Sequence, residues 1–122
     1  MVPPAPHEFL IGRTAHSTPE AKQAVLEGAD YLGVGPCFPT KTKKFRDFAT
    51  DGFLREVSEE IRLPTFAIGG ITCDNIDRLL HLGFKRFAVA SSIADAADPG
   101  EEVRRMCSLM SAPMENQSPK NL

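Results

Sequence analysis

Four short apolar runs, each followed by a stretch with helically spaced apolar residues, constrain the fold of this chain most strongly. The runs cover residues 9–12, 31–35, 64–68 and 87–90. This alternation predicts an α/β fold of strand–helix units, in which right-handed helical crossovers join parallel strands. Because the runs are apolar throughout rather than alternating, we expect strands that are covered on both faces.

Signals for the beginnings and ends of helices fall between these runs. Ser17 stands two residues before a proline, and Asp98 directly precedes another, so each is expected to cap a helix at its start. Asp74 or Asn75 is expected to cap the third helix, and Gly83 to end it in a left-handed conformation.

The length of the chain limits which βα architecture it can adopt. Parallel strands joined by helices fit either a small doubly wound sheet or part of a (β/α) barrel. A complete barrel takes about 250 residues, and this chain has 122, so it cannot close a barrel alone. We expect an irregular lead over residues 1–8, the strand–helix body over residues 9–111, and a disordered polar tail over residues 112–122.

The composition argues against several classes of partner. Fourteen basic and sixteen acidic residues give a net charge of −2, so we expect no nucleic-acid partner. No apolar run approaches the roughly 20 residues of a membrane helix, so no membrane partner is expected. Cys37, Cys73 and Cys107 are odd in number and lack metal-ligand spacing. They indicate free thiols in a cytoplasmic protein and no metal site in this chain.

Ligands of both candidate architectures bind at the carboxyl ends of the strands, so the residues after each run are the candidate site. Thr14 follows the first run and could donate its hydroxyl to an anion, or simply lie beside the helix cap. His16 could act as an acid or base, but packing beside the helix is the favoured interpretation. Cys37 and Cys73 both follow strand ends, and filling space is favoured over nucleophilic chemistry.

Hydroxyls and ammonium groups alternate after the second run. Thr40, Lys41, Thr42 and Lys43 stand directly behind a Gly-Pro…Pro frame, and such groups are the usual donors to phosphate oxygens. The alternative is a solvated basic loop.

Two consecutive loops after the third and fourth runs also suit phosphate. The free amides of Gly69 and Gly70 precede a helix, although two glycines can also make a plain tight turn. Ala90 and Ser91 open a short helix, where Ser91 is either an anion donor or a cap. Barrels commonly bind phosphate in the loops after their last two strands.

Read in order, these motifs resemble those of thiamine-phosphate synthases. The matching segments are residues 12–17, 28–43, 67–72 and 88–93, and the resemblance runs from about Phe9 to Met110. The related thiazole tautomerase branch generally lacks the Thr-x-Thr-Lys run, so the synthase is the better match. The resemblance implies the C-terminal (β/α)4 half of a TIM (β/α)8 barrel, with parallel strands and outer helices.

The resemblance also implies a reaction in thiamine biosynthesis. The family condenses 4-amino-2-methyl-5-pyrimidinylmethyl pyrophosphate with thiazole phosphate, giving thiamine phosphate and pyrophosphate with the help of Mg²⁺. Carried over by position, Lys43 is the catalytic residue that contacts the pyrophosphate of the pyrimidine substrate, and Thr14 lies near that pyrophosphate.

The thiazole substrate is implied to lie against the remaining motifs. By the same resemblance, Thr40 and Thr42 hold its phosphate end and Gly70 gives it a backbone contact. Ala90 and Ser91 complete the phosphate cradle with amides at the start of a helix.

Other features of the family have no counterpart in these 122 residues. They are the first four βα units, a Gln-x-Arg-x-Lys run, an asparagine and two magnesium-binding aspartates. We therefore expect catalysis only with an N-terminal half, from a separate chain or an upstream region. The alternative is a non-catalytic half barrel that binds a phosphorylated ligand, as a homodimer or as a thiazole tautomerase-like protein.

Overall fold

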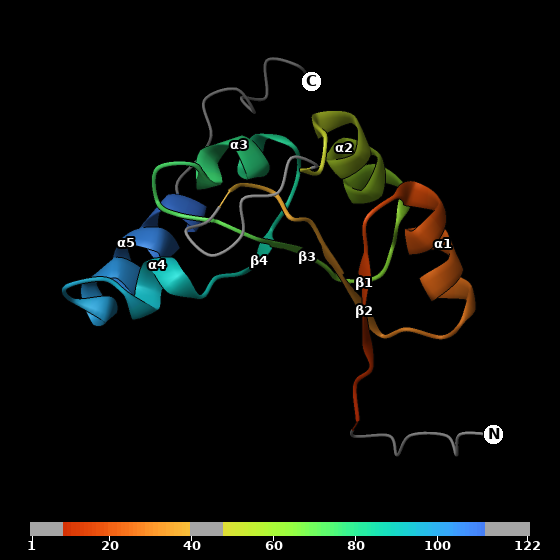
Figure 1. Cartoon of the computed structure of the whole chain (residues 1–122), viewed down its shortest axis with the longest axis horizontal. Helices are drawn as coiled ribbons and strands as arrows, with labels where there is room; N and C mark the ends of the chain where they lie inside the picture. Colours follow the sequence, from red (N-terminus) through yellow and green to blue (C-terminus); the bar gives the residue numbers. More distant parts are fainter. Residues whose placement is uncertain (1–8, 40–47, 112–122) are drawn as a thin grey trace.

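The computed structural model describes residues 9–39 and 48–111, which form four strands and five helices (Figure 1). The expected lead over residues 1–8 and tail over residues 112–122 lie outside the described residues. The elements in chain order are β1 (Gly12–Ala15), α1 (Thr18–Leu26), β2 (Tyr31–Val34), α2 (Asp51–Glu60), β3 (Thr65–Ile68), α3 (Ile76–His81), β4 (Arg86–Ala88), α4 (Ser91–Ala94) and α5 (Pro99–Ser111).

The four strands form one parallel sheet in the order β1-β2-β3-β4. Within residues 9–39 and 48–111, the helices pack against one face of the sheet, where Ala15, Leu32, Val34 and Ala67 are fully buried (Figure 1). A doubly wound sheet would reverse its strand order and carry helices on both faces. The sequential order and single covered face confirm the predicted α/β half barrel.

The expectation that the strands are covered on both faces is wrong for the described residues. Burial alternates along β2 and β3, and the second face carries Tyr31, Gly33, Phe66 and Ile68, which are half-buried or exposed. The rings of Tyr31 and Phe66 meet edge to face at 5.7 Å. These inward positions are apolar because a closed barrel fills its interior with side chains, and half a barrel leaves them open.

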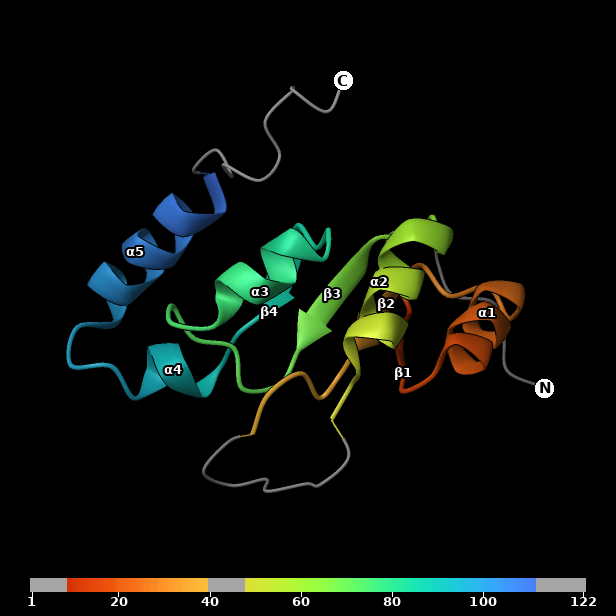
Figure 2. The ribbon, with the colours of Figure 1, turned by 90° about the horizontal axis from the view of Figure 1, so that it is seen from above.

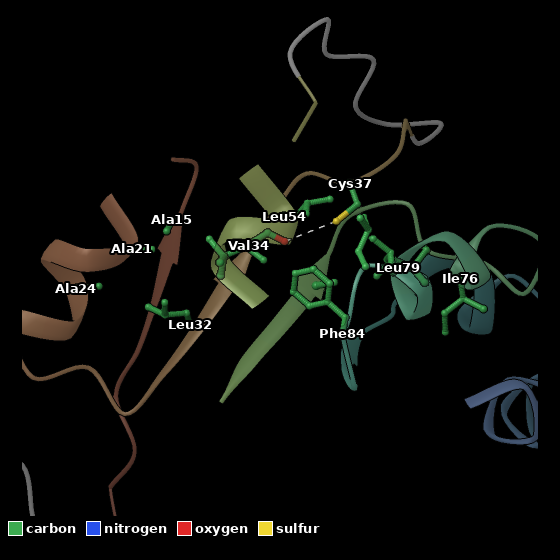
Figure 3. Packing of buried hydrophobic residues seen from close by; sticks show 14 of the residues in the cluster. Ala15, Ala21, Ala24, Leu32, Val34, Cys37, Leu54, Ile76, Leu79 and Phe84 are labelled. Atoms are coloured by element: carbon green, nitrogen blue, oxygen red, sulfur yellow. Dashed lines mark hydrogen bonds between the residues drawn. The ribbon is translucent and has the colours of Figure 1, made fainter. Parts of the chain in front are cut away.

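The core lies between the covered face and the helices (Figure 3). The largest fully buried side chains are Leu32, Leu54, Ile76, Leu79, Val34 and Val57. Burying each of these stabilises the fold by about 1.5–3 kcal/mol relative to exposure. This core holds the strands in register and therefore sets the positions of the loops at their ends.

The first strand starts later than its apolar run. Phe9 and Leu10 are 63% and 70% exposed, and pairing begins where Gly12 meets Tyr31. Residues 9–11 instead meet the turn before β2, where Ile11 and Asp30 exchange two hydrogen bonds of 2.7 and 2.8 Å.

The helix boundary signals are mostly confirmed. The Ser17 hydroxyl accepts a hydrogen bond from the Glu20 amide at 3.3 Å, and Asp98 Oδ1 accepts one from the Glu101 amide at 3.1 Å. Gly83 has a φ of 104° and follows α3, as predicted. No helix within the described ranges is long and apolar enough to span a membrane.

Candidate functional site

The carboxyl ends of the four parallel strands meet at one edge of the sheet. Figure 2 shows the arrowhead of β3 pointing to the side where α4 lies and where the connection after β2 leaves the sheet. The loops that carry the predicted site residues therefore start from the same edge. Because all strands run parallel, this edge gathers the polar groups that follow them.

Thr14 lies inside β1 rather than after it, one residue before the strand ends. It is exposed on the open face and pairs in register with Gly33 of β2. Both residues line a cavity of about 810 Å³, which is also lined by Phe66, Ile68 and Ala88. The Thr14 hydroxyl is thus free to meet a ligand on the open face near the carboxyl edge.

His16 lies at the start of α1. Its amide donates to Glu20 Oε1 at 2.8 Å, and its Nδ1 lies 3.5 Å from the same oxygen. The His16 side chain is 61% exposed and lies beside the first turn of α1, which fits the packing interpretation.

The turn after β3 is packed directly on the segment after β2. Gly69 and Gly70 have φ values of 100° and 68°, a conformation that side chains other than glycine disfavour. The Phe38 amide donates to the Gly69 carbonyl at 3.0 Å. A Cβ on Gly70 would lie 2.4 Å from the Phe38 carbonyl oxygen. Both glycines are therefore required by the close approach of the two loops as well as by their φ angles.

Asn75 braces this turn, a role that the sequence analysis missed. Asn75 holds the N-cap position of α3 but makes no capping bond to the helix. Its Nδ2 donates to the Gly70 carbonyl at 2.9 Å, and its Oδ1 accepts from the Thr72 amide at 2.8 Å. The sequence signal that could have indicated this role is a side-chain amide five residues after a Gly-Gly pair.

The predicted phosphate cradle lies at the start of α4. Ala90 is the N-cap residue, and its carbonyl accepts from the Ile93 and Ala94 amides at 3.1 and 2.9 Å. The first amides of a helix have no partner inside it, which leaves those of Ser91 and Ser92 available. Ser91 is exposed, and the Ser92 Oγ is buried without a hydrogen-bond partner among the described residues.

Cys37 is a packing residue in this structure. It is 4% exposed, and its Sγ donates to the Val34 carbonyl at 3.7 Å (Figure 3). Burial raises the pKa of the Cys37 thiol from 9.0 to about 11, so the thiolate that nucleophilic chemistry requires is scarce at neutral pH. Cys73 is buried as well.

Three predicted site residues, Thr40, Thr42 and Lys43, lie outside the described residues. The described ends of their connection are held at the sheet edge. There the Ala49 amide donates to the Pro36 carbonyl at 2.8 Å. The connection that carries the three residues thus leaves from beside the Gly69-Gly70 turn.

The described residues offer no evident metal site. Across residues 9–39 and 48–111, no three His, Cys, Asp or Glu side chains come together in a group that could hold a metal ion. Thr14, Gly70, Ala90 and Ser91 supply hydroxyls and backbone amides, which suit an anion rather than a cation.

Solved and curated proteins provide comparisons for this arrangement. Thiamine phosphate pyrophosphorylase from Pyrococcus furiosus superposes with a TM-score of 0.74 at 33% identity, covering 84% of this chain and 48% of that one. Thiamine-phosphate synthase of Gloeobacter violaceus is 46% identical over 92 residues, covering 75% of this chain and 27% of that protein. The synthase of Halalkalibacterium halodurans is 38% identical over 109 residues, covering 88% and 50%.

The chain thus spans a quarter to a half of the length of the curated relatives it matches. The sequence pattern of the family described as thiamine monophosphate synthase matches residues 3–93. That match covers most of the chain and includes every described candidate site residue, so this chain belongs to the thiamine monophosphate synthase family.

Proposed function

We propose that this chain is the phosphate-binding, C-terminal half of a thiamine-phosphate synthase. The whole enzyme would condense 4-amino-2-methyl-5-pyrimidinylmethyl pyrophosphate with thiazole phosphate to give thiamine phosphate and pyrophosphate. The observation that carries this proposal is the edge of the sheet where the Gly69-Gly70 turn and the start of α4 follow adjacent strands. Family membership supports the choice of these substrates. The free thiols support a cytoplasmic location.

The thiazole phosphate would lie along β3 and β4. The backbone of Gly70 would contact this substrate, in a turn whose shape is maintained by Asn75. The amides at Ala90 and Ser91 would hold the phosphate, because the start of a helix presents unpaired N–H groups and a positive end of the helix dipole. Thr40 and Thr42 would add hydroxyl donors to the same phosphate.

The pyrimidine pyrophosphate would lie nearer β1. Thr14 faces the open side of the sheet and would place its hydroxyl near the pyrophosphate. Lys43 would contact the pyrophosphate as it leaves. Departure of this group builds negative charge, and a fixed ammonium group stabilises such charge most where water is excluded.

Magnesium is the part of the family's chemistry that the described residues do not fit. No suitable group of carboxylates or imidazoles is found in the described part of the chain, and Mg²⁺ requires oxygen ligands such as carboxylates. We therefore assign the magnesium ligands to the complementary half.

The open face and both sheet edges fit a complementary (β/α)4 half. β1 and β4 end the sheet, and unpaired strand edges readily accept further strands. Closing the barrel would pair both edges and bury Tyr31, Phe66 and Ile68. The same edges also fit a second copy of this chain, which is the alternative: a homodimer that binds a phosphorylated ligand without catalysis.

Product formation tests the proposal. The chain is mixed with the N-terminal half of the Halalkalibacterium halodurans synthase, both substrates and Mg²⁺, and thiamine phosphate is measured as its fluorescent oxidation product. We expect product from the mixture and none from either half alone. A folded, associated mixture without product would contradict the proposal. A dimer of this chain that binds thiazole phosphate but does not associate with the N-terminal half would favour the non-catalytic homodimer.

A further inference from the structure

Arg78 of α3 contacts two residues that are far from it in sequence. Its Nε donates to Asp51 Oδ1 at 2.9 Å, and a second guanidinium nitrogen, Nη2, bonds to the same oxygen. On another side, the Arg78 Cζ lies 5.6 Å from the centre of the Phe38 ring. One planar guanidinium group therefore makes an ion pair and a cation–π contact at once.

These two partners stand at opposite ends of one connection. Phe38 follows β2, and Asp51 is the first residue of α2. The connection between these elements leaves the carboxyl edge of the sheet, and the Ala49 amide closes its base on the Pro36 carbonyl. Arg78 belongs to α3, so it links both ends of the connection to a helix that is separate from β2 and α2.

The same connection is attached to the Gly69-Gly70 turn. The Phe38 amide donates to the Gly69 carbonyl at 3.0 Å, and the Phe38 carbonyl oxygen lies 2.4 Å from the position that a Cβ of Gly70 would take. A displacement of Phe38 would therefore disturb the turn that is proposed to contact the thiazole substrate. Arg78 lies on α3, directly after that turn, and holds the Phe38 ring in place.

We infer that Arg78 is a positioning residue, which clamps Phe38 and Asp51 and thereby fixes the segment that contains Phe38 against the Gly70 turn. The clamp itself follows from these contacts, whereas its consequence for substrate rests on the proposed function. Lysine cannot replace this arginine fully, because its ammonium group lacks the flat face and the forked donors.

The strength of the clamp can be bounded. The side chains of Arg78 and Asp51 are 50% and 55% exposed, so their ion pair is weak. The cation–π contact adds an effect of similar size at an exposed site. Together they are expected to change roughly tenfold the equilibrium between the made and broken hydrogen bonds of the Phe38 and Ala49 amides.

Amide hydrogen exchange in the whole chain tests the clamp without any substrate. We expect Arg78→Ala to speed exchange at the Phe38 and Ala49 amides roughly tenfold, with Arg78→Lys in between. Exchange at the Leu32 amide, which bonds within the sheet to Pro64 at 3.0 Å, should not change. Equal rates at Phe38 and Ala49 in wild type and Arg78→Ala, or an equal increase at all three amides, would overturn the clamp.

Arg104→Ala is the matched control. Arg104 pairs with Glu101 at 2.9 Å on α5, and both side chains are similarly exposed, at 67% and 64%. This substitution removes an ion pair of the same kind away from the connection. It should leave the Phe38 and Ala49 amides unchanged.

Kinetics in the complemented mixture test the consequence for substrate. Arg78→Ala should raise the KM for thiazole phosphate severalfold and change kcat less, with partial rescue in Arg78→Lys. An unchanged KM together with faster exchange would overturn the role of Arg78 in positioning substrate. The contacts of Arg78 with Phe38 and Asp51 would still be supported. If a folded, associated wild-type mixture forms no product, the proposed function fails, and the exchange rates alone decide whether the clamp exists.

Discussion

Replacing Lys43 with alanine is expected to remove most of the thiamine phosphate formed by the complemented enzyme. Lys43 is proposed to contact the pyrophosphate of the pyrimidine substrate, where negative charge builds as the group leaves. Removing one well-placed donor to such charge slows catalysis by about 10²- to 10³-fold. The measurement is the initial rate of product formation at saturating concentrations of both substrates.

Lys44 provides the control for this prediction, since it is the neighbouring lysine in the same stretch. Lys44→Ala removes an equal charge from that stretch and should keep the rate within about threefold, because general charge contributes little compared with a directed contact. Equal rates in wild type and Lys43→Ala would show that the lysine assignment is wrong. Equal losses in both variants would show that the stretch acts only through its overall charge.

Replacing Gly70 with alanine is expected to cost about 2–5 kcal/mol of unfolding free energy. The left-handed backbone at Gly70, with a φ of 68°, costs another residue about 1–2 kcal/mol. The added Cβ would lie 2.4 Å from the Phe38 carbonyl oxygen, and relieving such overpacking costs typically 1–3 kcal/mol. Urea unfolding at fixed pH measures the sum.

Gly28 separates these two causes. Its φ is 91°, so Gly28→Ala meets a similar backbone cost, but a Cβ there would find nothing within 4 Å. We expect this control to lose only about 1–2 kcal/mol. Equal losses in the two variants would contradict the close packing of the Gly70 turn on the segment after β2.

The sequence predicted the elements whose signals are local. Ser17 and Asp98 cap their helices as expected, and β2 and β3 fall within their apolar runs. The first strand was placed too early because apolar character does not reveal register. Residues 9–11 are as apolar as a strand, yet β1 pairs with β2 only from Gly12 onward.

The apolar runs do not indicate whether one or both faces of the sheet are covered. Residues such as Phe66 and Ile68 are apolar because the family fold is a closed barrel, and a run looks the same whether or not its inner face is filled. The inward positions of β2 and β3 are therefore half-buried or exposed in this structure. The difference follows from how much of the barrel is present, which composition and periodicity do not encode.

The local geometry of the candidate site was predicted where backbone conformation follows from residue type, and missed where it depends on tertiary contacts. Gly70 and Ala90 were predicted to contact a phosphorylated ligand because glycines and helix starts present amides. Asp74 or Asn75 was expected to cap α3, but the Asn75 side chain donates to the Gly70 carbonyl and makes no capping bond. The contact of Arg78 with Asp51 joins residues 27 positions apart, and no local pattern indicates such a pair.

The most direct test of the phosphate-binding edge is a titration of the ¹⁵N-labelled chain with thiazole phosphate. The account predicts that the amide signals of Gly70, Ala90 and Ser91 shift together, and that the unphosphorylated thiazole leaves the Ala90 and Ser91 signals in place. No shift at these amides with ligand at about 1 mM, where even weak binding is populated, would contradict it. Equal shifts with both thiazoles would show that the edge does not recognise phosphate.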